Sequence, residues 1–428
     1  MIDWLDSRLH LAKHTRHALN HVFPDHWSFM LGEIALYSFV ILVLTGIYMM
    51  LFFHASSTPV VYHGSYKPLD GLTMTAAYAS AVHLSFDVPA GLLMRQMHHW
   101  AALIFVAAIV AHMMRIFFTA AYRRPREINW LIGVTLLALA IFNGYFGYSL
   151  PGDLLSGAGL RIAYAITLSI PFIGPWMAFL FFGNTYPSPA TIPRMYSLHI
   201  FLVPALIATL LALHLGIIWR QRHTNYPGPG RTDETIVGSR MWPTYAAKSL
   251  ALFCVLFALI GALGGLVEIN PIWMYGPYKP MDIMPGAQPD WYLGWIEGAM
   301  RLFPGVHGRL PDVLFPEIFF PAVVFPVIVF IVLYAYPFLE KPFVPRENRH
   351  VLLMPYQRPV STALGCAAFF LLLVCFFAAS DDVIAVAAGA SVTQIRTILR
   401  VLFFVAPAVT GTVAYIVCVK WPGRERCS

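Results

Sequence analysis

Two apolar stretches of the chain each carry a histidine near either end. In the first stretch, His98 and His112 are 14 residues apart. In the second, His199 and His214 are 15 residues apart. A helix turns by about 100° per residue, so both spacings are close to four whole turns and place each pair of histidines on nearly the same face. The spacing predicts two helices that can face each other with histidine pairs at two levels, roughly 21 Å apart.

Histidines inside an apolar helix need a hydrogen-bond partner or a ligand. A single one is most often a hydrogen-bonded core residue, but the same spacing in two helices favours a shared ligand. We therefore predict one haem iron between His98 and His199. A second iron would lie between His112 and His214, about 20 Å away. His99 is an alternative to His98, although its 13-residue distance from His112 places it further from the common face.

The composition is that of a membrane protein. The chain is 58% hydrophobic and 11% charged, whereas soluble proteins average about 25% charged residues. We predict an all-α, polytopic membrane protein with eight transmembrane helices. The predicted spans lie near residues 31–53, 98–121, 129–149, 196–219, 248–267, 315–337, 358–379 and 398–419. Residues 76–97 and 154–182 have the character of apolar surface helices or re-entrant segments.

The distribution of positive charge predicts the orientation. With the N-terminus inside, the inner segments carry 19 of the 28 lysines and arginines, which predicts that both termini are cytoplasmic. The net charge of +7 therefore reflects topology, and no basic stripe suggests a nucleic acid partner. A polar segment at 220–245 separates a predicted N-terminal four-helix di-haem half, residues 1–240, from a C-terminal four-helix half, residues 241–428.

The cysteines do not form a binding motif. None belongs to a CxxC or CxxCH sequence, so we expect no covalent haem and no zinc or iron–sulfur site on this chain. The five cysteines are Cys254, Cys366, Cys375, Cys418 and Cys427. Haem would be held by histidine alone.

Four glycines repeat the period of the histidines. Gly32 and Gly46 are 14 residues apart in the first predicted span, and Gly133 and Gly147 are 14 apart in the third. Glycine often marks a close approach between a helix and a neighbour. We expect Gly32 and Gly133 level with the inner histidines and the other two level with the outer histidines, where they would make room for the haems. Ordinary packing of small residues is the alternative.

Two arginines precede the outer histidines. Arg95 lies three residues before His98, and Arg194 lies five residues before His199. An arginine at the membrane boundary could bind haem propionates through charge-assisted hydrogen bonds. A side chain that merely extends to the membrane surface is an equally good interpretation of the sequence.

The long loop at about 268–313 contains a carboxylate among aromatic residues. The sequence there is Pro289-Asp290-Trp291-Tyr292. Asp290 near the outer membrane face is a candidate proton acceptor. An isolated aspartate in a loop is more commonly a turn residue.

In this order, the motifs resemble the cytochrome b family of respiratory and photosynthetic cytochrome bc complexes. The resemblance covers essentially the whole chain. It rests on the paired histidines and glycines, the segment Gly147-Tyr-Ser-Leu-Pro151 and the loop Pro289-Asp290-Trp291-Tyr292. The 15-residue histidine spacing, and Asp290 where many members have glutamate, resemble the actinobacterial branch that uses menaquinol.

The resemblance implies a quinol:cytochrome c reductase that runs a Q cycle in the cell membrane. Quinol would be oxidised near the outer face, at residues 289–292 and the segment after Gly147. Electrons would pass to a Rieske iron–sulfur subunit and across the two non-covalent b haems to quinone at an inner site. A c-type cytochrome subunit, a homodimer and a supercomplex with a terminal oxidase are the further partners that it implies.

The inner quinone site departs from the family pattern. Many members have Lys-Asp where this chain has Lys248-Ser249, so the carboxylate is missing. Lys248, His21 and His223 are the candidates for this site by location. Two other functions remain open from the residues themselves: a different membrane di-haem electron-transfer subunit, and a haem-free transporter whose histidines relay protons.

Overall fold

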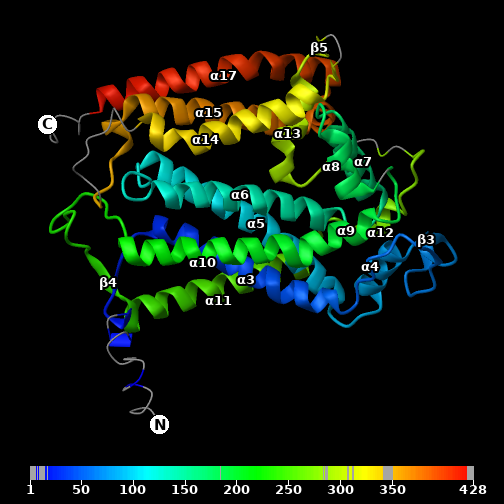
Figure 1. Cartoon of the computed structure of the whole chain (residues 1–428), viewed down its shortest axis with the longest axis horizontal. Coiled ribbons are helices and arrows are strands. Elements are labelled where there is room, and N and C mark those ends of the chain that lie inside the picture. The colour runs from blue at the N-terminus through cyan, green and yellow to red at the C-terminus, as the bar shows by residue number, and fades with distance from the viewer. Residues whose placement is uncertain are drawn as a thin grey trace.

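A computed structural model gives the fold as a bundle of membrane-spanning helices (Figure 1). It describes residues 6, 8, 15–16, 18–183, 185–282, 284, 288–305, 308–310, 313–340 and 350–421. Within these residues, eight helices are long and apolar enough to cross a membrane. They are α3 (Met30–Met50), α5 (Gly91–Phe118), α6 (Glu127–Tyr148), the continuous pair α9 (Thr191–Ser197) and α10 (Val203–Gln221), α11 (Ala246–Leu266), α14 (Phe325–Glu340), α15 (Pro359–Ala378) and α17 (Val392–Lys420). The prediction of an all-α, polytopic membrane protein is confirmed.

Several spans begin earlier than predicted, among them α5, the α9–α10 span and α17, which begins at Val392 rather than at 398. Helix α5 begins at Gly91 rather than at residue 98, and the α9–α10 span begins at Thr191 rather than at 196. Of the predicted surface segment at 76–97, α4 (Ala76–Phe86) remains a separate short helix, and the segment at 154–182 forms α7 (Leu154–Leu168) and α8 (Gly174–Phe182). Arg95 interrupts the apolar pattern in the sequence, but the folded chain supplies its guanidinium with a partner, the carbonyl of Asn270 at 3.0 Å. The charge is therefore accommodated inside the helix.

The helices run roughly parallel to one long axis and form a layered bundle (Figure 1). Helix α5 packs against α3, α10 packs against α6, and α15 packs between α13 (Trp291–Leu302) and α17. Helix α11 follows the predicted division at residues 240–241 but packs on α3 and α5. The two halves of the sequence therefore share one helical layer.

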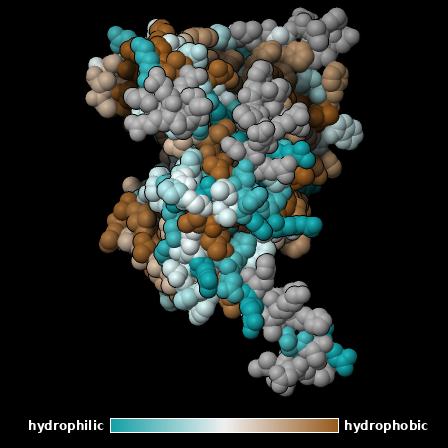
Figure 2. Space-filling view, turned by 90° about the vertical axis from the view of Figure 1, so that its left-hand side faces the viewer, coloured by the Kyte–Doolittle hydropathy of each residue, from teal (hydrophilic) through white to brown (hydrophobic). Residues whose placement is uncertain are grey.

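The two ends of the bundle differ. Helices α10 and α17 both finish at the left end in Figure 1, where strands β1 (Val22–Pro24) and β4 (Gly238–Arg240) pair; we call this the terminal end. The opposite, loop end carries α4, α7 (Leu154–Leu168), α8 (Gly174–Phe182) and α12 (Ile272–Tyr275). Figure 2 looks onto the terminal end and shows hydrophilic side chains gathered there, with hydrophobic ones along its flanks.

The remaining strands are short hairpins outside the helical layers. Strand β2 (Pro59–Val61) pairs with β3 (Thr73–Thr75), and β5 (Gly308–Leu310) pairs with β6 (Val313–Phe315), both antiparallel. Helix α16 (Asp381–Ala388) links α15 to α17. These elements close the loops and leave the helical bundle as the core.

A buried ion pair joins three helices near the terminal end. Arg358, at the start of α15, donates from Nε to Glu340 at the end of α14 over 2.9 Å. Its Nη2 donates to the hydroxyl of Tyr122 at 2.6 Å, and its Nη1 donates to the carbonyl of Phe117 at 2.8 Å. Tyr122 also donates to Glu340. Both charged side chains are buried, so the network fastens α14 and α15 to the end of α5.

Candidate functional site

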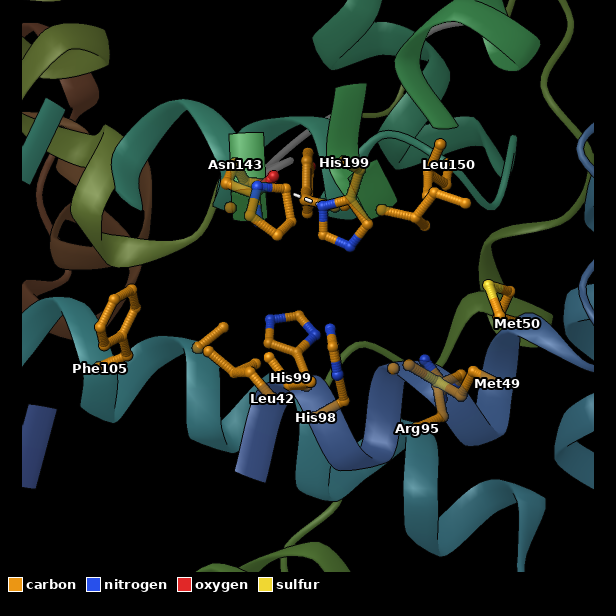
Figure 3. A pocket seen from close by; sticks show the side chains of 18 of the residues that line it. Leu42, Met49, Met50, Arg95, His98, His99, Phe105, Asn143, Leu150 and His199 are labelled. Atoms are coloured by element: carbon orange, nitrogen blue, oxygen red, sulfur yellow. Dashed lines mark hydrogen bonds between the residues drawn. The ribbon is translucent and has the colours of Figure 1, made fainter. Parts of the chain in front are cut away.

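His98 on α5 and His199 in the α9–α10 span face each other at the loop end (Figure 3). Their ring centroids are 6.1 Å apart, with an angle of 72° between the planes. His199 Nδ1 lies 2.9 Å from the carbonyl of Asn143, so it is the protonated nitrogen. The hydroxyl of Thr45 donates to the carbonyl of Ile41 and can therefore accept from His98 Nδ1 at 2.9 Å. In both rings the lone pair is left on Nε2, which is available to bind a metal.

His112 and His214 form a second pair nearer the terminal end. Their ring centroids are 6.5 Å apart, with an angle of 69° between the planes. Nδ1 of His112 is buried without a hydrogen-bond partner in the described part of the chain. Arg115 lies one helical turn further on, with its guanidinium 4.6 Å from the ring centre of Phe29 and its Nε also buried without a partner. Arg115 was not singled out from the sequence, although its position three residues after His112 was the available signal.

A wide turn explains why the second helix has the longer histidine spacing. Residues Leu198–Leu202 form a π turn, and His199 lies inside it. A π turn contains more residues than an α turn, so one additional residue is taken up between the ends of this span. The 15-residue interval from His199 to His214 therefore covers about the same number of turns as the 14-residue interval on α5.

Each of the four glycines faces one histidine, at the level that the sequence predicts. A Cβ atom built on the glycine would lie 3.3 Å from Cε1 of the imidazole for Gly32 and His112, 3.4 Å for Gly46 and His98, 3.9 Å for Gly133 and His214, and 2.4 Å for Gly147 and His199. Real Cβ atoms essentially never come within 3.0 Å of another heavy atom. The backbone at Gly147 therefore leaves no room for a side chain.

The residues at the two histidine pairs fit haem. No group of three or more histidine, cysteine, aspartate or glutamate side chains with metal-binding geometry occurs among the described residues. A bare ion between two imidazoles would therefore lack ligands, whereas a macrocycle supplies the remaining ones. A metal–imidazole bond is about 2.0–2.1 Å long in zinc sites, and the centroid separations of 6.1 and 6.5 Å leave space for one metal between each pair of rings.

Asp290 points into the same cavity as the loop-end histidines. The cavity measures about 290 Å³, and His98, His199 and Asp290 are among the residues that line it. Oδ1 of Asp290 lies 2.7 Å from Nε2 of His99, and Oδ2 accepts from the hydroxyl of Tyr292 at 2.9 Å. Asp290 precedes α13, but its side chain makes no cap hydrogen bond to that helix. The carboxylate is therefore held in the cavity rather than used in a turn.

The neighbours of Asp290 differ in what they contact. Tyr292 is buried and lines the cavity. Its burial is the larger cause, and the negative charge of the Asp290 carboxylate the smaller one, that raises the pKa of its hydroxyl well above the ordinary value. Pro289 and Trp291 do not line this cavity, and Trp291 packs against the hydrophobic core. His99, which the sequence presented only as a spare histidine, is the residue that reaches Asp290.

The two arginines at the loop end have different surroundings. Arg95 lines the cavity, with its guanidinium 5.3 Å from the ring centre of Trp273. Its Nε and Nη2 are buried without hydrogen-bond partners in the described residues. Arg194 does not line the cavity. It donates instead to the carbonyls of Phe179 and Leu180 at the end of α8, so it holds that helix.

The three candidates for an inner site do not form one cluster. His21 stacks on Trp219 with ring centroids 4.5 Å apart, and His223 lies 6.2 Å from His21. The pKa of His223 is lowered to about 3, mainly by its burial and to a smaller extent by the positive charges of neighbouring histidine and arginine side chains. Lys248 lies at the surface and pairs with Asp25 at 2.7 Å. The hydrogen bond from Lys248 lowers the pKa of that carboxyl.

Comparisons with known proteins identify the family to which the chain belongs. Residues 103–277 match the family model described as cytochrome b (N-terminal)/b6/petB. The cytochrome bc1 complex cytochrome b subunit of Mycobacterium tuberculosis is 48% identical and covers 99% of this chain and 77% of its own. The subunit of the same name from Streptomyces coelicolor is 43% identical, over 99% of this chain and 78% of its own.

The fold also has a solved relative. The structure of a hyperthermophilic respiratory Complex III matches with a TM-score of 0.71 at 20% identity, over 97% of this chain and 99% of that one. This likeness bears on the fold alone. The sequence relatives, which match 99% of this chain, establish that it belongs to the cytochrome b subunits of cytochrome bc1 complexes.

Proposed function

We propose that this cytochrome b subunit oxidises menaquinol at the loop end of the bundle and reduces quinone at the terminal end. The complex as a whole is a quinol:cytochrome c oxidoreductase. The observation that carries the proposal is the position of Asp290, whose carboxylate lines the same cavity as His98 and His199. A group that can take a proton thus lies beside the groups that can hold an electron acceptor. One quinol must give up a proton and an electron at the same place, so its oxidation needs the proton acceptor and the electron acceptor to be close together.

We propose that two non-covalent b haems occupy the two histidine pairs. His98 and His199 would bind one, and His112 and His214 the other. Bound haem supplies the one-electron redox chemistry that the side chains themselves lack. Gly32, Gly46, Gly133 and Gly147 leave the clearance beside the rings that a flat macrocycle needs. Arg95, with two unpartnered nitrogens in the cavity, is suited to bind a propionate.

We propose that Asp290 is the proton acceptor in quinol oxidation. Quinol loses two protons and two electrons in all. One O–H bond breaks and its proton passes to a carboxylate oxygen of Asp290 as one electron leaves to an acceptor; after Asp290 has released that proton to water, the second O–H bond breaks in the same way as the second electron leaves. The high pKa of Tyr292 keeps its hydroxyl protonated, so it holds Asp290 by donating a hydrogen bond. Pro289 would fix the backbone before Asp290, and Trp291 would anchor the loop through its packing.

The proposal includes partners and orientation. One electron of each quinol would leave to a Rieske iron–sulfur subunit, which passes it to a c-type cytochrome subunit. The other would cross the membrane through residues 1–240, while residues 241–428 contribute the quinol loop. We place the chain in the plasma membrane, with the loop end outside the cell and both termini in the cytoplasm, and as part of a homodimer. A supercomplex with a terminal oxidase fits the same scheme of electron transfer.

Rapid mixing of the purified complex with menaquinol tests this function. The wild-type complex should show haem reduction and reduction of the Rieske partner. Asp290→Asn should bind haem normally but oxidise quinol about 100-fold more slowly, because general base catalysis contributes on this scale. Unchanged quinol oxidation in the variant would exclude Asp290 as the essential proton acceptor. Absence of quinol oxidation in the wild-type complex would contradict the function itself.

A further inference from the structure

One amide side chain fastens the loop that carries Asp290 to the corner between α15 and α16 (residues 380–382). Nε2 of Gln288 donates to Oδ1 of Asp382 at 3.0 Å, and Oε1 of Gln288 accepts from the hydroxyl of Ser380 at 3.1 Å. Both ends of the amide are used, so its orientation is fixed. The partners of Gln288 are 92 and 94 positions away in the chain. The side chain therefore joins this loop to a distant part of the fold.

The backbone between Gln288 and Asp290 has little freedom. The intervening residue is Pro289, whose ring fixes φ at about −65°. The residue before a proline is itself restricted to extended conformations, because it would otherwise clash with the ring. A shift of Gln288 is therefore transmitted to Asp290 instead of being absorbed between them. The side chain of Asp290 makes no cap hydrogen bond to α13, so the position of its carboxylate depends on this backbone and on the contacts with His99 and Tyr292.

The same corner is also fixed to the far end of α13. Nη1 of Arg301, in the last turn of α13, donates to Oδ1 of Asp382 at 3.2 Å and to Oδ1 of Asp381 at 2.6 Å. Asp381 is buried, and its Oδ2 accepts from Nε of Arg396 on α17 at 2.8 Å. One oxygen of Asp382 thus accepts from Gln288, before α13, and from Arg301, near its end. The corner holds both ends of this helix.

Helix α13 lies too close to α15 to slide along it. A Cβ atom built on Gly298 would lie 1.6 Å from the carbonyl oxygen of Cys375, and one built on Gly294 would lie 3.3 Å from Cδ2 of Phe376. Cys375 and Phe376 belong to the last turn of α15. Such close packing between backbones does not deform gradually. Helix α13 and the corner therefore form one rigid unit, to which Gln288 attaches the loop.

The carboxylate of Asp382 is suited to hold two donors. It lies in the first turn of α16, where the backbone dipole favours negative charge. Burial acts to raise the pKa of the Asp382 carboxyl, but backbone hydrogen bonds and the charge of Arg301 outweigh burial and leave this pKa below its ordinary value. The group is therefore ionised at neutral pH. Hydrogen bonds to an ionised acceptor are stronger than those between neutral groups.

We propose that Asp382, acting through Gln288, positions the carboxylate of Asp290 for quinol oxidation. This inference rests on the proposed function. Neither Asp382 nor Gln288 lines the cavity that Asp290 shares with the loop-end histidines, so both are positioning residues. Asp290 is then held from two sides, by His99 on α5 and by the corner between α15 and α16. Such restraint matters because a displacement of about 1 Å can slow a reaction about 100-fold.

Gln288→Leu and Asp382→Ala in the complete complex test the proposal. The first removes the amide link and leaves the ion pairs of Arg301 in place, so it serves even if Asp382→Ala does not assemble. Asp382→Asn is the conservative variant, because it keeps an acceptor oxygen for Gln288. Asp87→Ala is the matched control: Asp87 also lies at a helix end at the loop end, is partly shielded, and accepts from the backbone N–H of Ser65 at 3.1 Å.

The measurements are kcat and KM for menaquinol, with haem content as the check on assembly. We expect Gln288→Leu and Asp382→Ala to lower kcat about 10-fold and to change KM by less than about 2-fold, because a misplaced proton acceptor slows the chemistry without weakening binding. Asp382→Asn should recover most of the rate, and Asp87→Ala should match wild type. Haem content should be the same in all four variants.

The combination of Gln288→Leu with Asp290→Asn gives a readout that a general loss of stability would not move. If Gln288 acts only through the carboxylate of Asp290, the double variant should be as slow as Asp290→Asn alone. Rate losses that multiply, or an unchanged kcat in both Gln288→Leu and Asp382→Ala, would overturn the proposal. A raised KM with an unchanged kcat would overturn it as well, since Gln288 would then contact the quinol. Unchanged quinol oxidation in Asp290→Asn would instead overturn the proposed function.

Discussion

Nε2 of His99 lies 2.7 Å from Oδ1 of Asp290, although the two residues are 191 positions apart in the chain. His99 follows His98 on α5, so its side chain points about 100° away around the helix axis. That rotation turns it from the histidine pair toward the loop that precedes α13. Each of the two side chains is only 12% exposed, so the contact is shielded from water. The pairing ties the proposed proton acceptor to the helix that carries the proposed haem ligand.

We predict that His99→Leu will retain both haems but oxidise quinol about 10- to 100-fold more slowly. A hydrogen bond to a charged group is worth about 1.5–3 kcal/mol, and its loss would release Asp290 from its position. Haem content and the quinol oxidation rate are the measurements, and His99→Gln, which keeps a donor, should recover part of the rate. Loss of one haem in His99→Leu would mean that His99 rather than His98 is the ligand.

The glycines allow a comparison of two equivalent substitutions. Gly147→Ala would bring a Cβ atom to 2.4 Å from the ring of His199, whereas Gly133→Ala would bring one to 3.9 Å from His214. The first is a clash that backbone or ring must relieve, and the second is ordinary contact. We predict that Gly147→Ala shifts the midpoint potential of one haem or loses that haem, while Gly133→Ala leaves both spectra unchanged. Equal effects of the two substitutions would contradict the clearance argument.

Removal of one histidine should separate the two pairs. His214→Leu leaves His112 without its partner 6.5 Å away but does not touch His98 or His199. We predict that the purified variant binds one haem per chain and that menaquinol still reduces it. Haem quantification and a visible spectrum are sufficient. If both haems are lost, or neither, the pairing of the two helices is wrong.

The buried ion pair of Arg358 and Glu340 should dominate the stability of its region. Arg358→Leu would leave Glu340 buried among hydroxyl groups without its cation, which costs about 3–5 kcal/mol in comparable sites. We predict a clear decrease in the thermal unfolding temperature of the detergent-solubilised protein. Lys67→Ala is the control, because Lys67 is 77% exposed and pairs with Asp70 only at the surface. Equal melting temperatures for wild type and Arg358→Leu would contradict a structural role for this pair.

The sequence predicts the features that repeat along helices. The lengths of the apolar stretches predict eight spans. The 14-residue spacing of the glycines predicts which histidine each of them faces. It does not predict partners that come from distant segments. From the sequence alone, Arg95 is expected to lie at the end of a span, but in the structure the carbonyl of Asn270 accepts its hydrogen bond within the bundle. Asp290 is expected to be a turn residue, but in the structure its carboxylate contacts His99. Gln288 gave no local signal, because its partners Ser380 and Asp382 lie 92 and 94 residues away.

A redox titration of the visible spectrum tests the central claim most directly. The complex would be purified with its partner subunits and titrated while the b-haem absorbance is recorded, and its non-covalent haem would be quantified per chain. Four histidines in two facing pairs predict two b haems with bis-imidazole spectra and separate midpoint potentials. A single b haem per chain, or none, would contradict the account.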